Sequence, residues 1–393
     1  MHTTTTTTET ELPEDLIEEI LLRLPIKSLI KFKTVSKQWL RLITSNRFAF
    51  KQCQIRTFDD STSSSFFVLH NLMTGDDNKN FITPVSVGIG CGGALNPKID
   101  LPYAAKMVNW NVHELFPAGF GIYFIFERTE GTVLLWNPTT RETKVLPSSP
   151  YYPSTSIAYA YHFGTFYYKD GNFSYKVCRV TSQKANWIDL NTRQFCLSLE
   201  LYSSETNSWK LIPNFCSDQF EGYADWTLHC SNLNGRAHWL IRSRNEDTFI
   251  TTFDYQTEVF SRIRAPSAPP EVGDYDKRRC IVTLFDDKFL CLLLFWGKNN
   301  KEFVDIWVMC QYGVEDSWTK ESTVGPIPMD REVLAFSSKV RAMFLQPRGN
   351  DTSRLILFYC NSLKGKRHRL GRKHRYQNMQ VVEYKKSLVS LLE

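Results

Sequence analysis

The sequence predicts a mainly β protein with a small N-terminal α module. Two observations carry this prediction: apolar residues fall at helical spacing only near the N-terminus, and a strand–turn–strand pattern recurs along the remainder. Of the 393 residues, 42% are hydrophobic and 22% are charged. These are values of an ordinary globular protein, so a fully disordered or collagen-like chain is excluded.

The sequence also indicates in which cellular compartment we expect the protein to act. The longest unbroken apolar run, Phe289 to Trp296, has eight residues, whereas a membrane-spanning helix needs roughly 20. The N-terminus has neither the basic nor the apolar region of a secretory signal, so we expect a cytoplasmic and/or nuclear protein with reduced thiols. The ten cysteines include no pair at CxxC spacing. We therefore expect no metal, no cofactor and no membrane partner.

The chain begins with a low-complexity threonine tract, and we expect residues 1–11 to be disordered. A helical module of three helices is predicted over residues 12–48. Pro13 suits the first turn of a helix, and Pro25 ends that helix. Between the two prolines, helical periodicity is carried by Leu16, Ile17, Ile20, Leu21 and Leu24.

This helical module carries more apolar side chains than it can enclose. From Leu12 to Ile43 there are 32 residues, of which 16 are Leu, Ile, Val, Phe or Trp. Units below about 40 residues usually need outside help to be stable. The surplus apolar surface would be covered either by a partner or by the rest of the chain, and composition does not decide between the two.

The same segment resembles an F-box. The resemblance rests on the run Leu12 to Leu29 and continues through Phe32-Lys33, Val35-Ser36-Lys37 and Trp39. One departure is Ser36, where the family most often has Cys. The resemblance implies binding to a Skp-type adaptor, and through it to the cullin and RING subunits of a ubiquitin ligase. Adaptor contact, or the packing that shapes it, would be carried by Leu12, Pro13, Leu16, Ile20, Leu24, Pro25, Leu29, Val35 and Trp39.

Residues 49–393 are predicted to form a β domain built from repeats. Two thirteen-residue units, 135–147 and 201–213, align at every position, and looser copies occur at 253–263 and 306–318. Each is a strand, a polar turn and a second strand, in which Asn137 would bond the turn backbone. The spacing suits four-stranded propeller blades, about six or seven of roughly 50 residues each. An open pair of β-sheets remains the alternative.

This β domain resembles the F-box-associated interaction domain of plant F-box proteins. The resemblance rests on the repeat units together with Tyr175 to Val180, Leu233 to Gly235, His238-Trp239 and Glu383-Tyr384. It includes the kelch-like S-locus F-box group without singling that group out. The resemblance implies a non-catalytic substrate-recognition subunit of an SCF-type (Skp–cullin–F-box) E3 ligase. Such a subunit binds a target protein and promotes its ubiquitination and proteasomal degradation.

The chain departs from the family pattern in two places. The glycine-rich stretch before Tyr175 is reduced to Phe163-Gly164, and a basic run interrupts the last repeat. We expect both departures to lie in loops, which would affect the identity of the target rather than the fold.

No motif in the sequence predicts catalysis. Gly88, Gly90 and Gly93 formally satisfy GxGxxG, the pattern of a dinucleotide-binding site. Pro97 follows closely and no helix is predicted there, so we interpret this segment as a glycine-rich loop. No histidine belongs to a zinc motif, and His238 beside Trp239 is interpreted as structural.

The basic run Lys364 to Arg375 holds seven Lys or Arg residues and no acid, so the net charge of +6 rests on it. It could be a solvated loop, a nuclear-import signal, or a site for an acidic protein or nucleic acid. Two other functions therefore stay open: a non-ligase propeller that binds a small ligand or carbohydrate, and a nuclear nucleic-acid-binding protein. Nucleic acid is the less favoured partner, because no aromatic residue for base stacking occurs before Tyr376.

Overall fold

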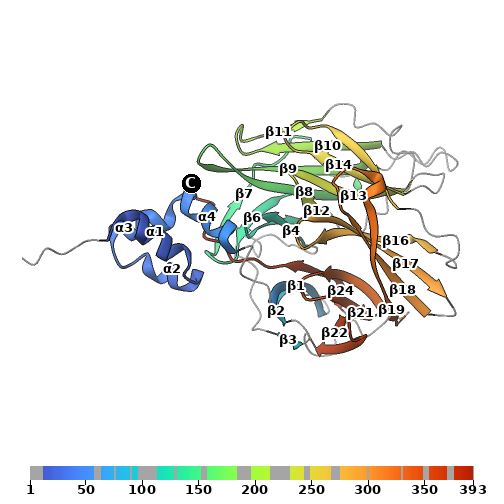
Figure 1. Cartoon of the computed structure of the whole chain (residues 1–393). Helices are drawn as coiled ribbons and strands as arrows, with labels where there is room; N and C mark the ends of the chain where they lie inside the picture. The colour runs from blue at the N-terminus through green and yellow to red at the C-terminus, as the bar shows by residue number, and fades with distance from the viewer. Residues whose placement is uncertain are drawn as a thin grey trace, which may run out of the picture.

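The structure is a computed structural model in which four helices precede a ring of β-sheets (Figure 1). No described helix is both long and apolar enough to cross a membrane. The structure describes residues 12–56, 63–74, 77–88, 91–95, 113–127, 131–151, 157–183, 196–212, 231–242, 248–266, 275–298, 301–328, 331–347, 354–369 and 376–392.

The helical module contains α1 (Glu14–Leu22), α2 (Ile26–Phe32), α3 (Lys37–Thr44) and α4 (Asn46–Arg56). Serine hydroxyls begin the last two helices: Ser36 Oγ accepts a hydrogen bond from Trp39 N at 3.1 Å, and Ser45 Oγ accepts one from Phe48 N at 3.2 Å. The sequence predicted three helices, so α4 is an addition. The boundary expected at residue 48 falls inside α4.

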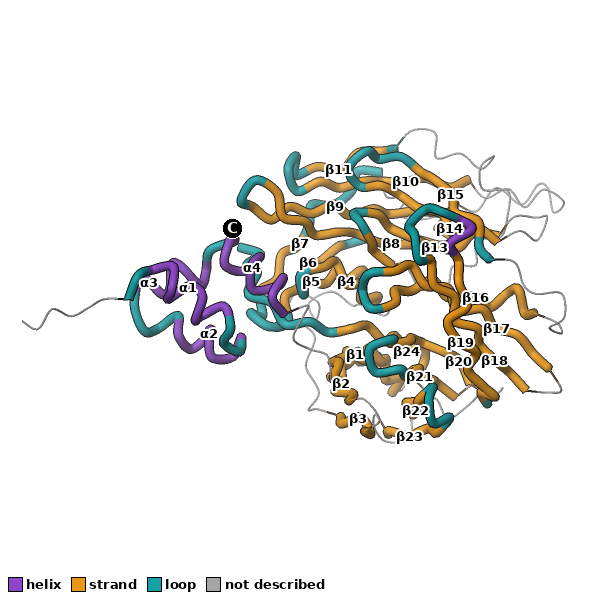
Figure 2. Tube along the Cα trace, in the orientation of Figure 1, coloured by secondary structure: helices purple, strands orange, loops and turns teal. Residues whose placement is uncertain are grey.

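The β domain is a six-bladed propeller, which replaces the alternative of two open sheets. Six four-stranded antiparallel sheets are described, and contacts between the first strands of neighbouring blades arrange them in a ring around a common axis, which we call the central channel of the propeller; Figure 2 shows the arrangement of the strands. Blades 1 to 5 each use four consecutive strands. Blade 6 joins the two ends of the domain, because the late strand β24 pairs with β1 in the order β24-β1-β2-β3.

The strands of blades 1 and 2 are β4 (His113–Gly119), β5 (Ile122–Glu127), β6 (Val133–Asn137), β7 (Glu142–Val145), β8 (Ile157–Lys169), β9 (Asn172–Gln183), β10 (Cys196–Ser203) and β11 (Ser208–Leu211). Those of blades 3 and 4 are β12 (Ser231–Leu233), β13 (Arg236–Arg242), β14 (Thr248–Asp254), β15 (Phe260–Arg264), β16 (Tyr275–Phe285), β17 (Phe289–Lys298), β18 (Lys301–Met309) and β19 (Trp318–Ile327), with a 3-10 turn at Glu315–Ser317. Those of blades 5 and 6 are β20 (Arg331–Ser337), β21 (Ala342–Pro347), β22 (Arg354–Tyr359), β23 (Lys364–Arg369), β24 (Tyr376–Glu383), β1 (Ser63–Thr74), β2 (Asp77–Gly88) and β3 (Cys91–Leu95).

The repeat units of the sequence are the outer hairpins of the blades, formed by the third and fourth strands. In blade 1, Asn137 Oδ1 accepts hydrogen bonds from Thr139 N and Thr140 N at 2.8 and 3.3 Å, as the turn chemistry predicted. Arg141 N then donates to Asn137 O at 2.8 Å, with a positive φ of 66° at Arg141. Blade 5 has a turn of this kind after Tyr359, in the last repeat of the sequence, which the basic run interrupts.

Both departures from the family pattern lie in strands, so the expectation of loops was wrong for the described residues. Gly164 lies within β8, where an added Cβ would come within 2.3 Å of the Phe124 ring of blade 1. Glycine is needed there because the two blades pack closely. Gly93 of the GxGxxG pattern likewise lies in β3, while Gly90 lies outside the described residues.

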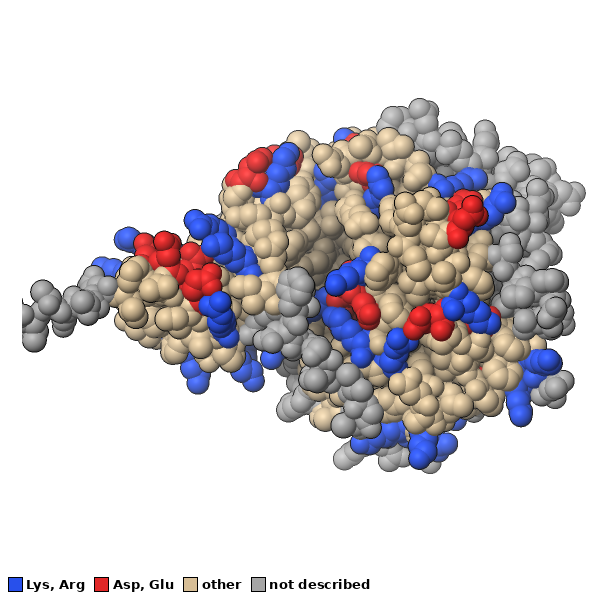
Figure 3. Space-filling view, viewed as in Figure 1, with Lys and Arg blue, Asp and Glu red and all other residues tan. Residues whose placement is uncertain are grey.

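The first half of the basic run is a strand and not a solvated loop. Residues 364–369 form β23, the outer strand of blade 5, and residues 370–375 lie outside the described part. Lys364, Lys366 and Arg367 are exposed, and blue side chains gather at this edge of the molecule in Figure 3. Lysine on an outer strand opposes edge-to-edge pairing with another chain, so the charge suits the position.

Candidate functional site

Helix α1 is apolar on two sides, and only one of them is covered by the chain. Leu21 and Leu22 are buried within the module, with 1% and 2% of their surface exposed. On the other side, Leu12, Leu16 and Ile20 are 58%, 52% and 53% exposed. Leu16 and Ile20 are four residues apart and lie on one stripe of α1, and Leu12 lies two residues before the helix begins at Glu14. We call these three residues the α1 stripe. The stripe is an apolar surface of the kind that marks an interaction site.

The other residues predicted to serve adaptor binding fall into three groups. Pro13, Pro25 and Val35 are exposed, and Leu24 and Trp39 are half-buried. Leu29 is fully buried in the module, so it can shape the surface but cannot contact a partner. Two exposed apolar residues of α2 and α3 were missing from the predicted set, namely Ile30 and Leu40, with exposures of 38% and 43%. Their positions on α2 and α3 become distinguishable from core positions only once the helices are packed.

Helix α4 attaches the module to the propeller. The Phe50 ring stacks on Tyr168 of β8 with ring centroids 4.1 Å apart, and lies 5.9 Å from the Phe120 ring of blade 1. On its other side, Lys51 Nζ lies 2.7 Å from Glu18 Oε1 of α1. The surplus apolar surface is therefore divided: α4 docks onto the chain's own propeller, while the α1 stripe stays open.

The segment after β24 reinforces this joint. Its residues Leu388, Val389 and Leu391 are buried in one apolar cluster with residues of both the helical module and blade 1. Asn137 Nδ2 donates to Val389 O at 2.7 Å and to Ser387 O at 3.3 Å. We call Ser387–Leu391 the C-terminal clasp; in Figure 1 the C mark lies beside α4.

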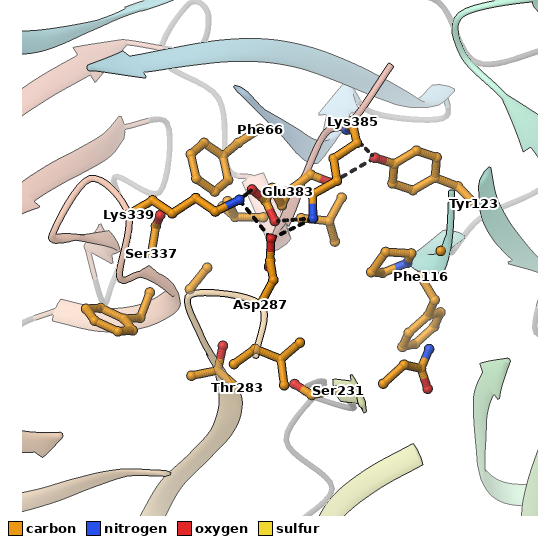
Figure 4. A pocket seen from close by; sticks show the side chains of 18 of the residues that line it. Phe66, Phe116, Tyr123, Ser231, Thr283, Asp287, Ser337, Lys339, Glu383 and Lys385 are labelled. Carbon is orange, nitrogen blue, oxygen red and sulfur yellow. Dashed lines mark hydrogen bonds and ion pairs between the residues drawn. The ribbon is translucent and has the colours of Figure 1, made fainter. Parts of the chain in front are cut away.

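One end of the central channel is hollowed into a cavity of about 310 Å³. Its walls come from the first strands of blades 1, 3, 4, 5 and 6, and Figure 4 shows it at close range. The size is at the lower end of the roughly 300–1,000 Å³ typical of small-molecule pockets. None of its lining residues was singled out from the sequence as a binding residue.

Four charged side chains meet at this cavity. Asp287 Oδ2 accepts hydrogen bonds from Lys339 Nζ at 2.7 Å and from Lys385 Nζ at 2.8 Å. The Glu383 carboxylate lies 3.6 Å from each ammonium group. In Figure 4 the two lysines approach Asp287 from different directions. The four residues come from three blades and the clasp's leading segment, so they meet only when the ring closes.

The charges of this group stabilise one another. Burial by itself raises the pKa of Asp287, but the ammonium groups of Lys385 and Lys339 outweigh burial and lower that pKa below its usual value. Burial by itself lowers the pKa of Lys385, but Glu383 and Asp287 outweigh it and raise that pKa. Asp287 and Lys385 are therefore both ionised at neutral pH.

His238 is a buried titratable residue elsewhere in the propeller, and its contacts are with the fold itself. Burial lowers the pKa of His238 to about 4, so its imidazole is neutral. The ring donates from Nδ1 to Ser231 O at 3.1 Å and accepts at Nε2 from the Tyr312 hydroxyl at 2.8 Å. The interpretation of His238 as structural fits these contacts. Within the described ranges, no cluster of His, Cys, Asp or Glu side chains is placed to hold a metal ion.

The helical module has an open apolar stripe and packs against a propeller that contains a cavity, which defines a two-part interaction protein. Comparison with family models gives the family. Residues 10–51 match the F-box domain, and residues 96–391 match the F-box associated beta propeller domain. The chain belongs to the plant F-box proteins that carry this propeller.

Individual relatives are distant in sequence. A probable F-box protein of Arabidopsis thaliana is 24% identical over 314 residues, covering 77% of this chain and 65% of that protein. An Arabidopsis F-box/kelch-repeat protein is 27% identical over 265 residues, covering 65% of this chain and 61% of the relative. Another F-box/kelch-repeat protein of the same plant is 26% identical, covering 81% and 77%. The match thus spans less than two thirds of the length of the first two relatives.

Proposed function

We propose that this chain is the substrate-recognition subunit of an SCF-type ubiquitin ligase. In this proposal the helical module binds a Skp-type adaptor, and the propeller binds a target protein that is then ubiquitinated and degraded. The observation that carries the proposal is the α1 stripe of Leu12, Leu16 and Ile20, which stays exposed although α4 docks onto the propeller.

The chain would contribute to the reaction by position and not by chemistry. Holding target and ligase in one complex raises the effective concentration of target lysines near the activated ubiquitin. The docking of α4 and the C-terminal clasp supports such a role, because both fix the propeller relative to the adaptor-binding module. We further propose that the chain acts in the cytoplasm, the nucleus or both.

The test is a charge placed on the open stripe. Ile20→Glu is preferable to a change at Leu24, because Leu24 packs against the module's own core and its loss would also unfold the helices. A carboxylate in an apolar interface costs several kcal/mol, so we expect adaptor affinity to fall at least about 100-fold, at 1.4 kcal/mol per tenfold. The measurement is adaptor binding by purified full-length chain.

Val259→Glu is the matched control, because Val259 of blade 3 is an aliphatic residue that is 59% exposed. This control should bind the adaptor like the unaltered chain. Equal adaptor affinity for Ile20→Glu and the unaltered chain would refute the assignment of the stripe. In cells, the Ile20→Glu chain should hold undegraded targets, which affinity capture can then identify.

A further inference from the structure

The cavity at the end of the central channel has unused hydrogen-bonding capacity. An ammonium group carries three donors. Among the described residues, Lys339 and Lys385 each form one hydrogen bond there, to the same oxygen of Asp287. The Glu383 oxygens, at 3.6 Å, are beyond hydrogen-bonding distance. Each lysine thus has donors left for another acceptor.

The two ammonium groups are placed so that one ligand group can reach both. They approach a single oxygen atom of Asp287, so they are close neighbours. Their side chains are 24% and 44% exposed, which leaves them open to an incoming group. A carboxylate has two acceptor oxygens and can bridge two such donors.

The walls below these lysines are largely apolar. Phe66 of blade 6, Phe116 of blade 1 and Phe336 of blade 5 line the cavity, as do Ile281 and Val282 of blade 4. Hydroxyl groups are fewer among the lining residues, and Figure 4 labels those of Ser231, Thr283 and Ser337. The cavity therefore combines an apolar interior with two lysines whose charges are balanced by Asp287 and Glu383.

We propose that this cavity binds a carboxylate carried on an apolar body, with the acidic group bridging Lys339 and Lys385 and the apolar body inside the channel. The group is either part of a free organic acid or an acidic–apolar segment of the target protein. The inference deepens the proposed function, on which its biological meaning rests, by naming the chemistry that the propeller recognises. The cavity also borders the joint with the helical module. Its lining includes Phe120, which contacts α4, and Lys385, which lies two residues before the clasp.

The probes are ω-phenyl carboxylates from 3-phenylpropanoate to 6-phenylhexanoate, titrated calorimetrically into the full chain. The matched neutral probes are the corresponding amides, and acetate is the probe without an apolar body. We expect saturable binding of at least one phenyl carboxylate, with affinity at least tenfold higher than that of its amide and of acetate. Equal affinity for acid and amide, or no saturable binding by any carboxylate of the series, would overturn the proposal.

The variants are Lys339→Met and Lys385→Met, each expected to weaken the carboxylate at least tenfold. Lys210→Met is the control, because Lys210 also pairs with a carboxylate, Glu258 at 2.6 Å, but lies outside the cavity lining. Thr283→Leu fills the cavity without touching the charges and should weaken the acid and its amide alike. Retained binding in Lys339→Met, Lys385→Met and Thr283→Leu would refute the site.

A competition experiment separates the two sources of the acidic group. Octapeptides with a central Phe-Glu pair, and control peptides with Phe-Gln, are added to the complex with the best phenyl carboxylate. Displacement by Phe-Glu alone identifies a target segment, and no displacement by either identifies a free acid; displacement by both equally would contradict carboxylate recognition. Adaptor binding by Lys339→Met should be unchanged, and Ile20→Glu should still bind the acid, so failure of either proposal is visible separately.

Discussion

A buried ion pair between Arg179 of β9 and Glu200 of β10 lies inside blade 2, where both residues also contact the blade 1 side, and its removal gives a quantitative prediction. The two side chains are fully buried, with Arg179 Nη1 3.3 Å from Glu200 Oε2. The Arg179 guanidinium also donates to Gly131 O of blade 1 and lies over the Trp209 ring, 4.7 Å from its centroid. Ser149 Oγ, which follows blade 1 in the chain, donates to Glu200 Oε2 at 2.5 Å.

The expected cost of Arg179→Met follows from these contacts. Removing one partner of a buried ion pair costs about 3–5 kcal/mol, because the other charge remains buried without compensation. Loss of the stacking on Trp209 adds about 1 kcal/mol. We therefore expect the free energy of unfolding to fall by about 5 kcal/mol, a large share of the roughly 5–15 kcal/mol by which a domain is stable.

The measurement is urea unfolding of the full chain. The double variant Arg179→Met/Glu200→Gln should recover about half of the loss, because the buried charge is gone while an acceptor for Ser149 remains. Lys210→Met removes an exposed ion pair, with Lys210 55% exposed, and should cost less than about 1 kcal/mol. A loss below 1 kcal/mol in Arg179→Met, or a double variant no more stable than the single one, would refute the reasoning.

Three further predictions concern other parts of the propeller. Burial lowers the pKa of His238 to about 4, whereas an unfolded histidine titrates near pH 6.5, so the unfolded chain takes up the proton first. The free energy of unfolding should therefore fall by on the order of 3 kcal/mol as the pH drops from about 6.5 to 4. His238→Gln should lose this pH dependence, and an unchanged pH profile in that variant would contradict the prediction. Asn137→Ala removes two hydrogen bonds to the clasp. Each bond is worth about 1 kcal/mol and 1.4 kcal/mol corresponds to tenfold, so amide hydrogen exchange at Val389 should accelerate at least about tenfold. Unaltered exchange would show that these bonds do not hold the clasp. Neutralising the four cations of β23 should change the free energy of unfolding by no more than about 0.5 kcal/mol per residue, yet it should increase self-association measured by sedimentation. A variant that stays monomeric would show that these cations do not protect the strand edge. Loss of nuclear accumulation in the same variant would support an import signal.

Local sequence signals predicted the elements whose formation depends on neighbouring residues. Helices α1 to α3 follow from apolar spacing and from Pro13 and Pro25, and the outer hairpins follow from turn residues such as Asn137. Helix α4 was missed because its apolar contact residue Phe50 is paired with Tyr168, more than a hundred positions away. Strand β23 was read as a loop because its polar sequence becomes a strand only by pairing with β22.

The candidate sites divide in the same way. The exposed stripe lies in one short segment formed by α1 and the residues just before it, so a short resemblance was enough to name Leu12, Leu16 and Ile20. The residues of the cavity could not be found in this manner, because Asp287, Lys339 and Lys385 stand in separate segments and no spacing relates them. Only closure of the ring brings their charges together.

The joining of β24 to β1 in blade 6 also determines the order in which the protein can mature during translation. The helical module leaves the ribosome first, and β1 to β3 follow as a sheet that lacks its axial strand. The edge of β1 stays unpaired until β24 has been synthesised after all the other blades. Because an unpaired edge invites pairing with other chains, this nascent intermediate is exposed to wrong pairing until β24 is in place. A premature stop codon before Tyr376 would make that state permanent, because the product would lack the strand that closes blade 6.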